Sequence, residues 1–323
     1  MAHVPLMAGG NDFISTAMHI SDPEKSWAIY GVLEPDTVQY YSFYRKLGER
    51  IYLKLQKSAD PEEKDFQPNL VLLGPGLEPS GQLPDDVVLP AGLEDLGILT
   101  VQGSEAANAT YEPFGPSSYI EMGEINISAP QSARYYAAVY GSNPAGQTVD
   151  RWAGHYSLGV GYREEFSFTE RITMPFRLIS VYLWEGQNLG LLFLPYLLAE
   201  IIGLLIFWRG SRHTAFCLAG TLAGFLFLGT SASILTQMVF SLSRAPFGPE
   251  VYITLAIAFF HALLGVAVIR LARGEAGILQ RILMAVLGTI ALLAGSGLIM
   301  GPILAMAASL LPSKKGSILS NAL

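Results

Sequence analysis

The chain has 323 residues and a net charge of −7, and 51% of its residues are hydrophobic while only 15% are charged. A composition this apolar excludes an ordinary soluble enzyme. The acidic balance excludes a nucleic-acid surface, and the single cysteine, Cys217, excludes internal disulfides, Cys-based zinc or iron–sulfur sites and two-thiol redox chemistry.

The charges divide the chain near residue 185. Residues 1–185 contain 24 acidic and 12 basic side chains, a net charge of −12, whereas residues 186–323 contain 3 acidic and 8 basic side chains, a net charge of +5. Such a contrast indicates two domains in different solvents. We therefore predict a water-exposed domain over residues 1–185 and a membrane domain over residues 186–323.

The amino-terminal residues, Met1 to Pro5, have neither a basic start nor an apolar run. We expect either that a leader has been removed or that the first membrane span drives export. Removal of Met1 and Ala2 would leave a free amine and an imidazole on His3, the chelate of a copper-binding histidine brace. Such a brace also needs a second histidine, His19 or His155, and a frayed terminus is the alternative interpretation.

Much of the first half has the two-residue periodicity of half-buried strands. Apolar and polar side chains alternate over residues 51–56, 156–160 and 166–169, and residues 40–43 and 135–140 form aromatic runs. Gly- and Pro-rich clusters at residues 74–76, 79–81 and 115–118 predict turns. The pattern predicts an antiparallel β-sandwich of the jelly-roll type.

The same half resembles the bacterial pre-peptidase C-terminal (PPC) type of β-sandwich in four segments: YYSFYRKLGERIYLKL (40–55), PNLVLLGPG (68–76), ARYYAAVYG (133–141) and GHYSLGVG (154–161). The resemblance covers roughly residues 25–165 and implies an accessory or binding module outside the cell rather than a catalyst. Phe66-Gln67-Pro68 stands where the family often has an acidic pair, which argues against a calcium site. Residues 77–132 form an insertion longer than the family's usual connection.

Two aromatic residues near the end of the first half are candidates for contact with the membrane surface. Tyr182 and Trp184 lie just before the first apolar stretch, where amphipathic aromatic side chains anchor proteins at the level of the lipid headgroups. No Gly/Ser linker separates the halves, so we expect the sandwich to rest on the membrane.

Asn108 and Asn126 begin Asn-X-Ser/Thr sequons, which an external location would expose to glycosylation.

Four apolar stretches in the second half are each long enough to cross a bilayer as a helix: residues 189–208, 214–240, 251–269 and 282–311. Arg209 and Arg212 follow the first stretch and Arg270 and Arg273 follow the third, whereas the second loop offers only Arg244. The positive-inside rule then predicts that the first and third loops are cytoplasmic and that the first domain lies outside the plasma membrane.

The fourth stretch is longer than the others and contains Gly301-Pro302. It either crosses the membrane or breaks near this pair into an interfacial or re-entrant piece, which leaves the path of residues 282–323 open. Gly220-x-x-x-Gly224 and Gly297-x-x-x-Gly301 have the spacing that lets two helices approach closely, within the bundle or against a partner. Polar residues from Thr230 to Gln237 give one half of the second stretch a polar side, suited to an outward cavity or a neighbouring subunit.

Glu200 and His261 lie inside the apolar stretches. Each precedes an arginine, Arg209 or Arg270, by nine residues, so both lie about 14 Å inside at one depth. Because a charge there is costly, the pair is a functional hypothesis: a proton relay, an ion site or a site for a quinone-like ligand. The alternative is a hydrogen bond that only joins helices. A self-contained haem is not expected, because His261 is the only histidine inside a stretch.

The sequence contains no Gly-x-Ser-x-Gly, no His-Glu-x-x-His and no phosphate-loop motif. It therefore predicts no catalytic residue and no cofactor. It favours an integral membrane protein whose outward-facing β-sandwich makes it a binding or assembly subunit of a membrane complex. Its partners would be the bilayer, other membrane subunits or an extracytoplasmic ligand. The alternatives are a transporter, sensor or redox-complex component that uses Glu200 and His261, and a copper-dependent activity at His3.

Overall fold

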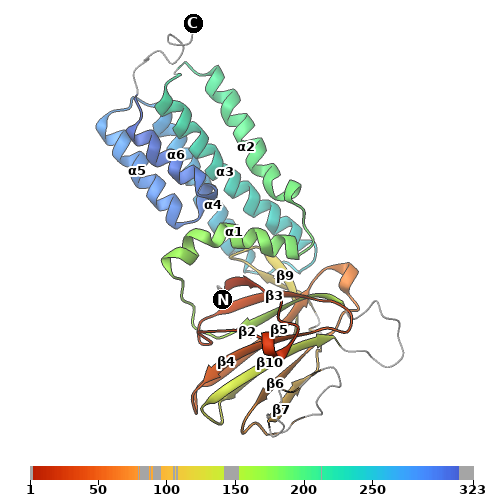
Figure 1. Cartoon of the computed structure of the whole chain (residues 1–323). Helices are drawn as coiled ribbons and strands as arrows, with labels where there is room; N and C mark the ends of the chain where they lie inside the picture. Colours follow the sequence, from red (N-terminus) through yellow and green to blue (C-terminus); the bar gives the residue numbers. More distant parts are fainter. Residues whose placement is uncertain are drawn as a thin grey trace.

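The computed structural model describes residues 3–78, 80, 87, 89, 96–104, 106, 108–141, 153–211 and 213–312. The strands are β1 (Val4–Met7), β2 (Met18–His19), β3 (Trp27–Leu33), β4 (Val38–Arg45), β5 (Arg50–Ser58), β6 (Pro68–Gly74), β7 (Gly97–Val101), β8 (Thr110–Glu112), β9 (Ser117–Ser128), β10 (Ala133–Gly141) and β11 (Gly154–Val160). The helices are α1 (Phe168–Trp184), α2 (Leu189–Arg209), α3 (Ala215–Leu242), α4 (Val251–Arg273), α5 (Ile278–Leu293) and α6 (Met300–Leu310). A β-rich half is thus followed by an all-α half, which confirms the predicted fold class (Figure 1).

Two sheets enclose the core of the first half. Their strand orders are β1-β3-β11-β5-β9-β8 and β2-β4-β10-β6-β7. β1 pairs with β3 and β2 pairs with β4 in parallel, while the other strand pairs are antiparallel. The alternating apolar positions predicted for residues 51–56 and 156–160 point inward, and Leu53, Leu55, Tyr156 and Leu158 are completely buried. Period-two patterning therefore places this core correctly.

The predicted insertion, residues 77–132, contains the strands β7, β8 and β9 of the sandwich. β9 lies inside the first sheet, between β5 and β8. A register shift opposite Leu55 and Gln56 leaves an extra residue in β9 near Met122. The buried positions therefore change phase between Met122 and Ile125, and the two-residue alternation that marks the other strands is interrupted here.

The strand predicted at residues 166–169 is wrong, because Ser167 caps helix α1 and Phe168 begins it. The Ser167 hydroxyl accepts a hydrogen bond from the Glu170 amide, and the Glu170 carboxylate accepts one from the Ser167 amide at 2.7 Å. This reciprocal capping box starts a helix. α1 lies across the end of the helical bundle, between the bundle and the sandwich (Figure 1).

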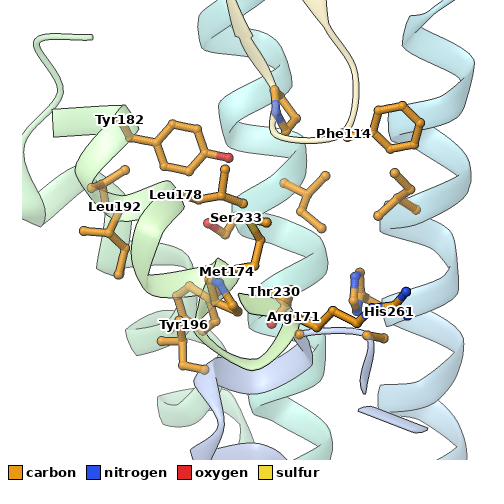
Figure 2. Close-up of a pocket in the computed structure, with 18 of the residues that line it drawn as sticks. Phe114, Arg171, Met174, Leu178, Tyr182, Leu192, Tyr196, Thr230, Ser233 and His261 are labelled. Carbon is orange, nitrogen blue, oxygen red and sulfur yellow. The ribbon is translucent and has the colours of Figure 1, made fainter. Parts of the chain in front are cut away.

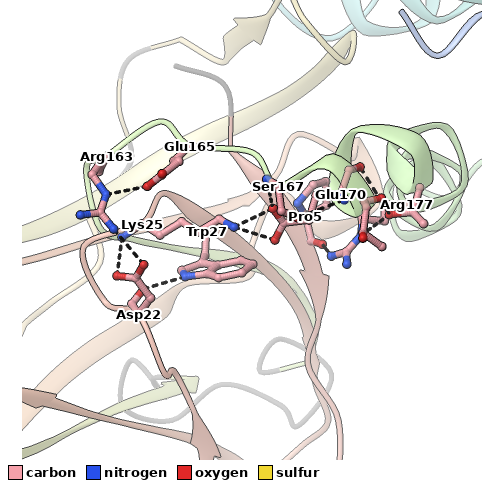
Figure 3. Close-up of polar contacts among 11 residues, drawn as sticks. Pro5, Asp22, Lys25, Trp27, Arg163, Glu165, Ser167, Glu170 and Arg177 are labelled. Atoms are coloured by element: carbon pink, nitrogen blue, oxygen red, sulfur yellow. Dashed lines mark hydrogen bonds and ion pairs between the residues drawn. The ribbon is translucent and has the colours of Figure 1, made fainter. Parts of the chain in front are cut away.

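Polar contacts hold the first turns of α1 on the sandwich (Figure 3). Lys25 donates to both carboxylate oxygens of Glu170 at 2.6 Å, and Arg177 donates to the Pro5 carbonyl at 2.8 Å. Arg163, just before the helix, pairs with Asp22 at 3.0 Å. Burial alone would raise the pKa of Glu170, but hydrogen bonds from Lys25 and Ser167 hold it below its ordinary value. The start of α1 is thus docked through an ionised carboxylate.

The end of α1 is buried by aromatic packing. Trp184 is 5% exposed, its indole N–H donates to the Gly31 carbonyl at 2.9 Å, and its ring meets the edge of Tyr30 at 4.9 Å between centroids. Tyr182 is also buried. The predicted contact of Tyr182 and Trp184 with lipid headgroups is therefore corrected, because the helix turns both rings into the protein.

Three helices, α2, α3 and α4, are long and apolar enough to cross a membrane, and they match the first three predicted spans. Both α2 and α4 pack against α3. The fourth predicted span is instead a pair of shorter helices: Arg281 of α5 donates to the Ser309 carbonyl of α6 at 2.7 Å, so the start of α5 lies beside the end of α6. The chain reverses before the predicted Gly301-Pro302 break, and this pair lies in the first turn of α6, where proline is tolerated.

Direct contacts join the sandwich to the bundle. Arg244, just after α3, donates to the Glu185 carbonyl at 3.0 Å and to the Asp60 carboxylate at 2.9 Å. The hydroxyls of Tyr111 in β8 and Thr254 in α4 are 2.7 Å apart. The boundary predicted near residue 185 falls between α1 and α2, and α1 contacts elements on both sides of it.

Candidate functional site: a cavity between the sandwich and the bundle

A cavity of about 360 Å³ lies where α1, the bundle and the turn between β8 and β9 meet (Figure 2). Its walls include Phe114 from the turn, Met174 from α1, Tyr196 from α2, Ser233 from α3, His261 from α4 and Gly295 from the turn between α5 and α6. Ligand sites in proteins usually have this form, with apolar walls and a few polar groups that converge on the ligand.

Hydroxyl groups enter the cavity from three helices. The Tyr196 hydroxyl lies toward Thr230 and Ser233. Thr230 is already engaged, since it donates to the Leu226 carbonyl and accepts from the Gly297 amide at 2.7 Å. Figure 2 shows the Tyr182 hydroxyl directed into the cavity from α1. The burial of Tyr182, and next the nearby Glu185, raise the pKa of this phenol well above its ordinary value, so Tyr182 stays a hydrogen-bond donor.

His261 is the most buried polar group of the cavity wall that lacks a partner. The residue is 4% exposed, and its Nδ1 atom makes no hydrogen bond to any part of the chain that the structure describes. A buried polar atom without a partner costs about 1–3 kcal/mol. A bound molecule that hydrogen-bonds to this ring would remove that cost.

Glu200 and His261 do not form the predicted hydrogen bond. The buried Oε1 atom of Glu200 has no partner among the described residues, and Glu200 is absent from the cavity wall. The two residues share a depth, but α2 and α4 both pack on α3 and have little contact with each other. Equal depth along two helices does not make the helices neighbours, which is why the sequence argument fails for this pair.

The turn between α5 and α6 borders the cavity in a strained conformation. Leu298 and Ile299 have φ angles of 52° and 66°, and Gly295 and Gly297 are also in the positive-φ region. Positive φ is costly for a β-branched residue such as Ile299. The Gly297–Thr230 hydrogen bond holds the turn, and Pro175 of α1 packs beside Gly295. Strain of this kind concentrates at functional sites, which supports this location.

A second cavity, of about 210 Å³, lies between the first sheet and α1 and contains His3. The His3 Nδ1 atom is 2.5 Å from the Ser26 hydroxyl, and burial lowers the pKa of His3 to about 4. Burial also raises the pKa of Glu112 on the same wall. The two cavities share Phe114 and Met174 among their wall residues, so only a layer of side chains separates them.

The second cavity does not assemble the predicted copper brace. Neither His19 nor His155 lines it, and His155 instead pairs with Glu63. Within the described ranges, no group of three or more His, Cys, Asp or Glu side chains is placed to hold a metal ion. A copper activity at a processed His3 stays a prediction, and neither of the two predicted second histidines lines the cavity that contains His3.

The predicted packing glycines lie at close helix contacts inside the bundle. A Cβ atom on Gly224 would lie 2.8 Å from the Gly265 carbonyl oxygen of α4, and one on Gly220 would lie 2.6 Å from the Ala272 side chain. Gly297 and Gly301 face Phe227 of α3. The sequence leaves open whether these glycines pack within the bundle or against a partner. Their contacts in the structure are all within the bundle of one chain.

The sequon residues Asn108 and Asn126 are both exposed. The Asn126 side chain accepts a hydrogen bond from Arg50 at 2.9 Å on the surface of the first sheet. Glycosylation of these residues stays a prediction.

The sequence missed most of this site. Tyr196 and Arg171 carry no signal in the sequence and Tyr182 is assigned there to the lipid interface, whereas His261, through its depth, and the polar side of the second stretch, through Thr230 and Ser233, do point to the site. The capping box at Ser167 was the available signal for α1, which closes the cavity.

Comparisons with known proteins identify no family for this chain, so its function is inferred from the geometry of the cavity. No protein-family model matches the chain, and no curated protein matches it. The surface-associated copper-binding protein CorA of Methylomicrobium album BG8 is similar in structure with a TM-score of 0.23 and 11% identity, over 46% of this chain and 98% of CorA. The secreted copper-binding protein MopE of Methylococcus capsulatus gives a TM-score of 0.18 and 16% identity, over 39% of this chain and 70% of MopE. The resemblance to the PPC family stays a prediction.

Proposed function

We propose that this chain is an integral membrane protein whose β-sandwich lies outside the plasma membrane and whose cavity between the sandwich and the bundle binds a membrane-soluble ligand. The observation that carries the proposal is the cavity itself. It is walled by residues of helices α1 to α5 and of the connecting turns, it lies beside a strained turn, and it contains His261, whose Nδ1 atom has no hydrogen-bond partner among the described residues. The sequence favours a binding or assembly subunit in general terms; a membrane-soluble ligand beside His261 is closer to its alternative of a ligand site at this histidine.

The charge distribution supports the outward orientation. Arg209 ends α2, Arg273 ends α4 and Arg281 lies near the start of α5, all at the end of the bundle away from the sandwich. Positive charge of this kind accumulates on the cytoplasmic side. Since α6 ends beside the start of α5, the described chain also finishes at that end of the bundle.

A cavity-filling variant tests the proposal. Ser233→Trp places a large ring in the cavity, while Leu235→Trp places the same ring on an exposed position of the same helix. The protein is extracted in mild detergent, and molecules that co-purify are identified by mass spectrometry. We expect a small apolar molecule in the wild type and in Leu235→Trp and its loss in Ser233→Trp. Identical contents in all three proteins would contradict ligand binding in this cavity.

The surface of α2 favours a second function, assembly with another membrane protein. Only 11% of the apolar window of α2 is buried within the chain, compared with 56% for α3. A groove of about 400 Å³ runs between α2 and α3 and is lined by apolar side chains such as Leu194, Leu198 and Ile202. If a partner helix binds in this groove, the protein should run as a particle larger than the monomer after mild extraction. Ala199→Phe should dissociate this complex. A monomer in both samples would reject assembly through this groove.

A further inference from the structure

The cavity continues into a groove on the exposed side of α4. This groove, of about 600 Å³, is lined by Tyr252, Ala256 and Phe260, and it shares His261 and Ile257 with the cavity. Tyr252 is 63% exposed and Phe260 is 42% exposed, so the groove opens toward the surrounding lipid. A molecule with its head in the cavity can therefore extend an apolar tail along α4 into the bilayer.

The polar groups of the inner cavity suit hydrogen-bond acceptors. Tyr196 and Ser233 offer hydroxyl groups, and His261 offers a ring without a partner at Nδ1. No Asp or Glu is among the described residues that line the cavity, and Arg171 is their only permanently charged side chain. Arg171, which α1 contributes to the wall, is an exposed residue. The ligand head should thus carry oxygen atoms that accept hydrogen bonds.

The depth of these groups argues for an uncharged head. Tyr196 lies seven residues into α2 and His261 lies ten residues into α4, about 10 and 15 Å from the helix ends beside the sandwich. A charged group at such depth is costly unless it is paired with an opposite charge, and the one permanently charged side chain among the described wall residues, Arg171, belongs to an exposed residue of α1. A carboxylate or phosphate head would pair with Arg171, whereas a neutral head needs only the hydrogen bonds of the inner wall.

We propose that the ligand is a neutral molecule with a compact, carbonyl-bearing head and a long apolar tail, which is the chemistry of membrane quinones. The head hydrogen-bonds to His261, Ser233 and Tyr196, and the tail lies in the groove beside Ala256. The proposal rests on the proposed ligand-binding function and adds the class of ligand and its route from the bilayer.

Three probes and two variants test the proposal on the full chain in lipid nanodiscs. The probes are a decyl-substituted benzoquinone, the same benzoquinone without the tail, and decanoate. We expect saturable binding of the decyl quinone and weaker binding of the tail-free ring. His261→Phe keeps the ring shape but loses the hydrogen bond, so the dissociation constants of both quinones should rise about fivefold. Leu263→Phe, at an exposed position of α4, is the control and should change neither.

The second variant tests the route of the tail. Ala256 is exposed and lines only the groove, so Ala256→Trp should weaken binding of the decyl quinone and leave the tail-free ring unchanged. If His261→Phe does not fold, Ser233→Ala provides the head-group test with the same expected direction.

Each outcome supports or overturns the proposal. Tighter binding of decanoate than of either quinone would overturn it in favour of an anionic amphiphile at Arg171. Quinone affinities that neither His261→Phe nor Ser233→Ala changes would also overturn it, because the head would then not contact these residues. If Ser233→Trp removes a co-purifying molecule while no quinone binds, the binding function stands and the quinone assignment is wrong. If neither effect occurs, both are wrong.

Discussion

Replacing Trp184 with alanine should release the end of α1 from the sandwich. The indole is 5% exposed, donates to the Gly31 carbonyl and packs on the edge of Tyr30. Truncation of a buried Trp to Ala costs about 3–5 kcal/mol, a figure that includes the lost hydrogen bond and the cavity left behind. The substitution should mainly lower the free energy that holds α1 on the sandwich, because the ring lies between the helix and β3.

Limited trypsin digestion measures that docking. Arg177 lies in α1 and donates to the Pro5 carbonyl, so cleavage after Arg177 requires the helix to leave the sandwich. When opening is fast relative to cleavage, the cleavage rate follows the population of the open form. A loss of about 3 kcal/mol should therefore raise the rate about a hundredfold. Trp184→Phe, which keeps an aromatic ring but loses the donor, should give an intermediate rate.

Trp208→Ala is the matched control. Trp208 is 66% exposed near the far end of α2, so its truncation should leave cleavage after Arg177 unchanged. If Trp184→Ala and Trp208→Ala gave the same rate as the wild type, the reasoning that Trp184 fastens α1 would be refuted.

Three further predictions concern the two ends of α1 and the bundle. Burial raises the pKa of Glu185 to about 7 from 4.5, so the folded state binds the extra proton and stability should fall as the pH rises between these values; Glu185→Gln should flatten a series of thermal unfolding curves over this range. Glu170 behaves in the opposite way, because its pKa is lowered and its stabilisation is lost on acidification; Glu170→Gln should lower the thermal unfolding temperature at neutral pH and make little difference in acid. Gly224→Leu would force a side chain against the Gly265 carbonyl and should destabilise the bundle by about 1–3 kcal/mol, whereas Val239→Leu, at an exposed position of α3, should leave the unfolding temperature in detergent nearly unchanged.

The sequence predicts elements whose signal is local. Alternation identifies the strands around Leu53 and Leu158, because each of these strands buries one face without interruption. The three spans through α2, α3 and α4 follow from their apolar length alone. β9 is not predicted, because its bulge near Met122 breaks the alternation. α1 is not predicted either, because the alternation of Phe166 and Phe168 resembles a strand, while the helix signal lies in the Ser167–Glu170 cap.

The candidate site depends on contacts that no local pattern encodes. The reversal at Gly295–Ile299 requires Thr230 of α3 to hold the Gly297 amide, a contact 67 residues apart in the chain. Depth places Glu200 and His261 at one level, but the packing of both helices on α3 decides that only His261 lines the cavity. Helix neighbours, rather than helix positions, determine the site, and a single sequence carries little information on neighbours.

The central claim is that the cavity between the sandwich, α1 and the bundle holds a ligand from the membrane. An electron cryomicroscopy map of the full chain in nanodiscs made from native membrane tests it most directly. The account predicts continuous non-protein density in contact with His261 that runs out along α4 past Ala256. A cavity that contains only water, or that closes by movement of α1 onto Ser233, would contradict the account.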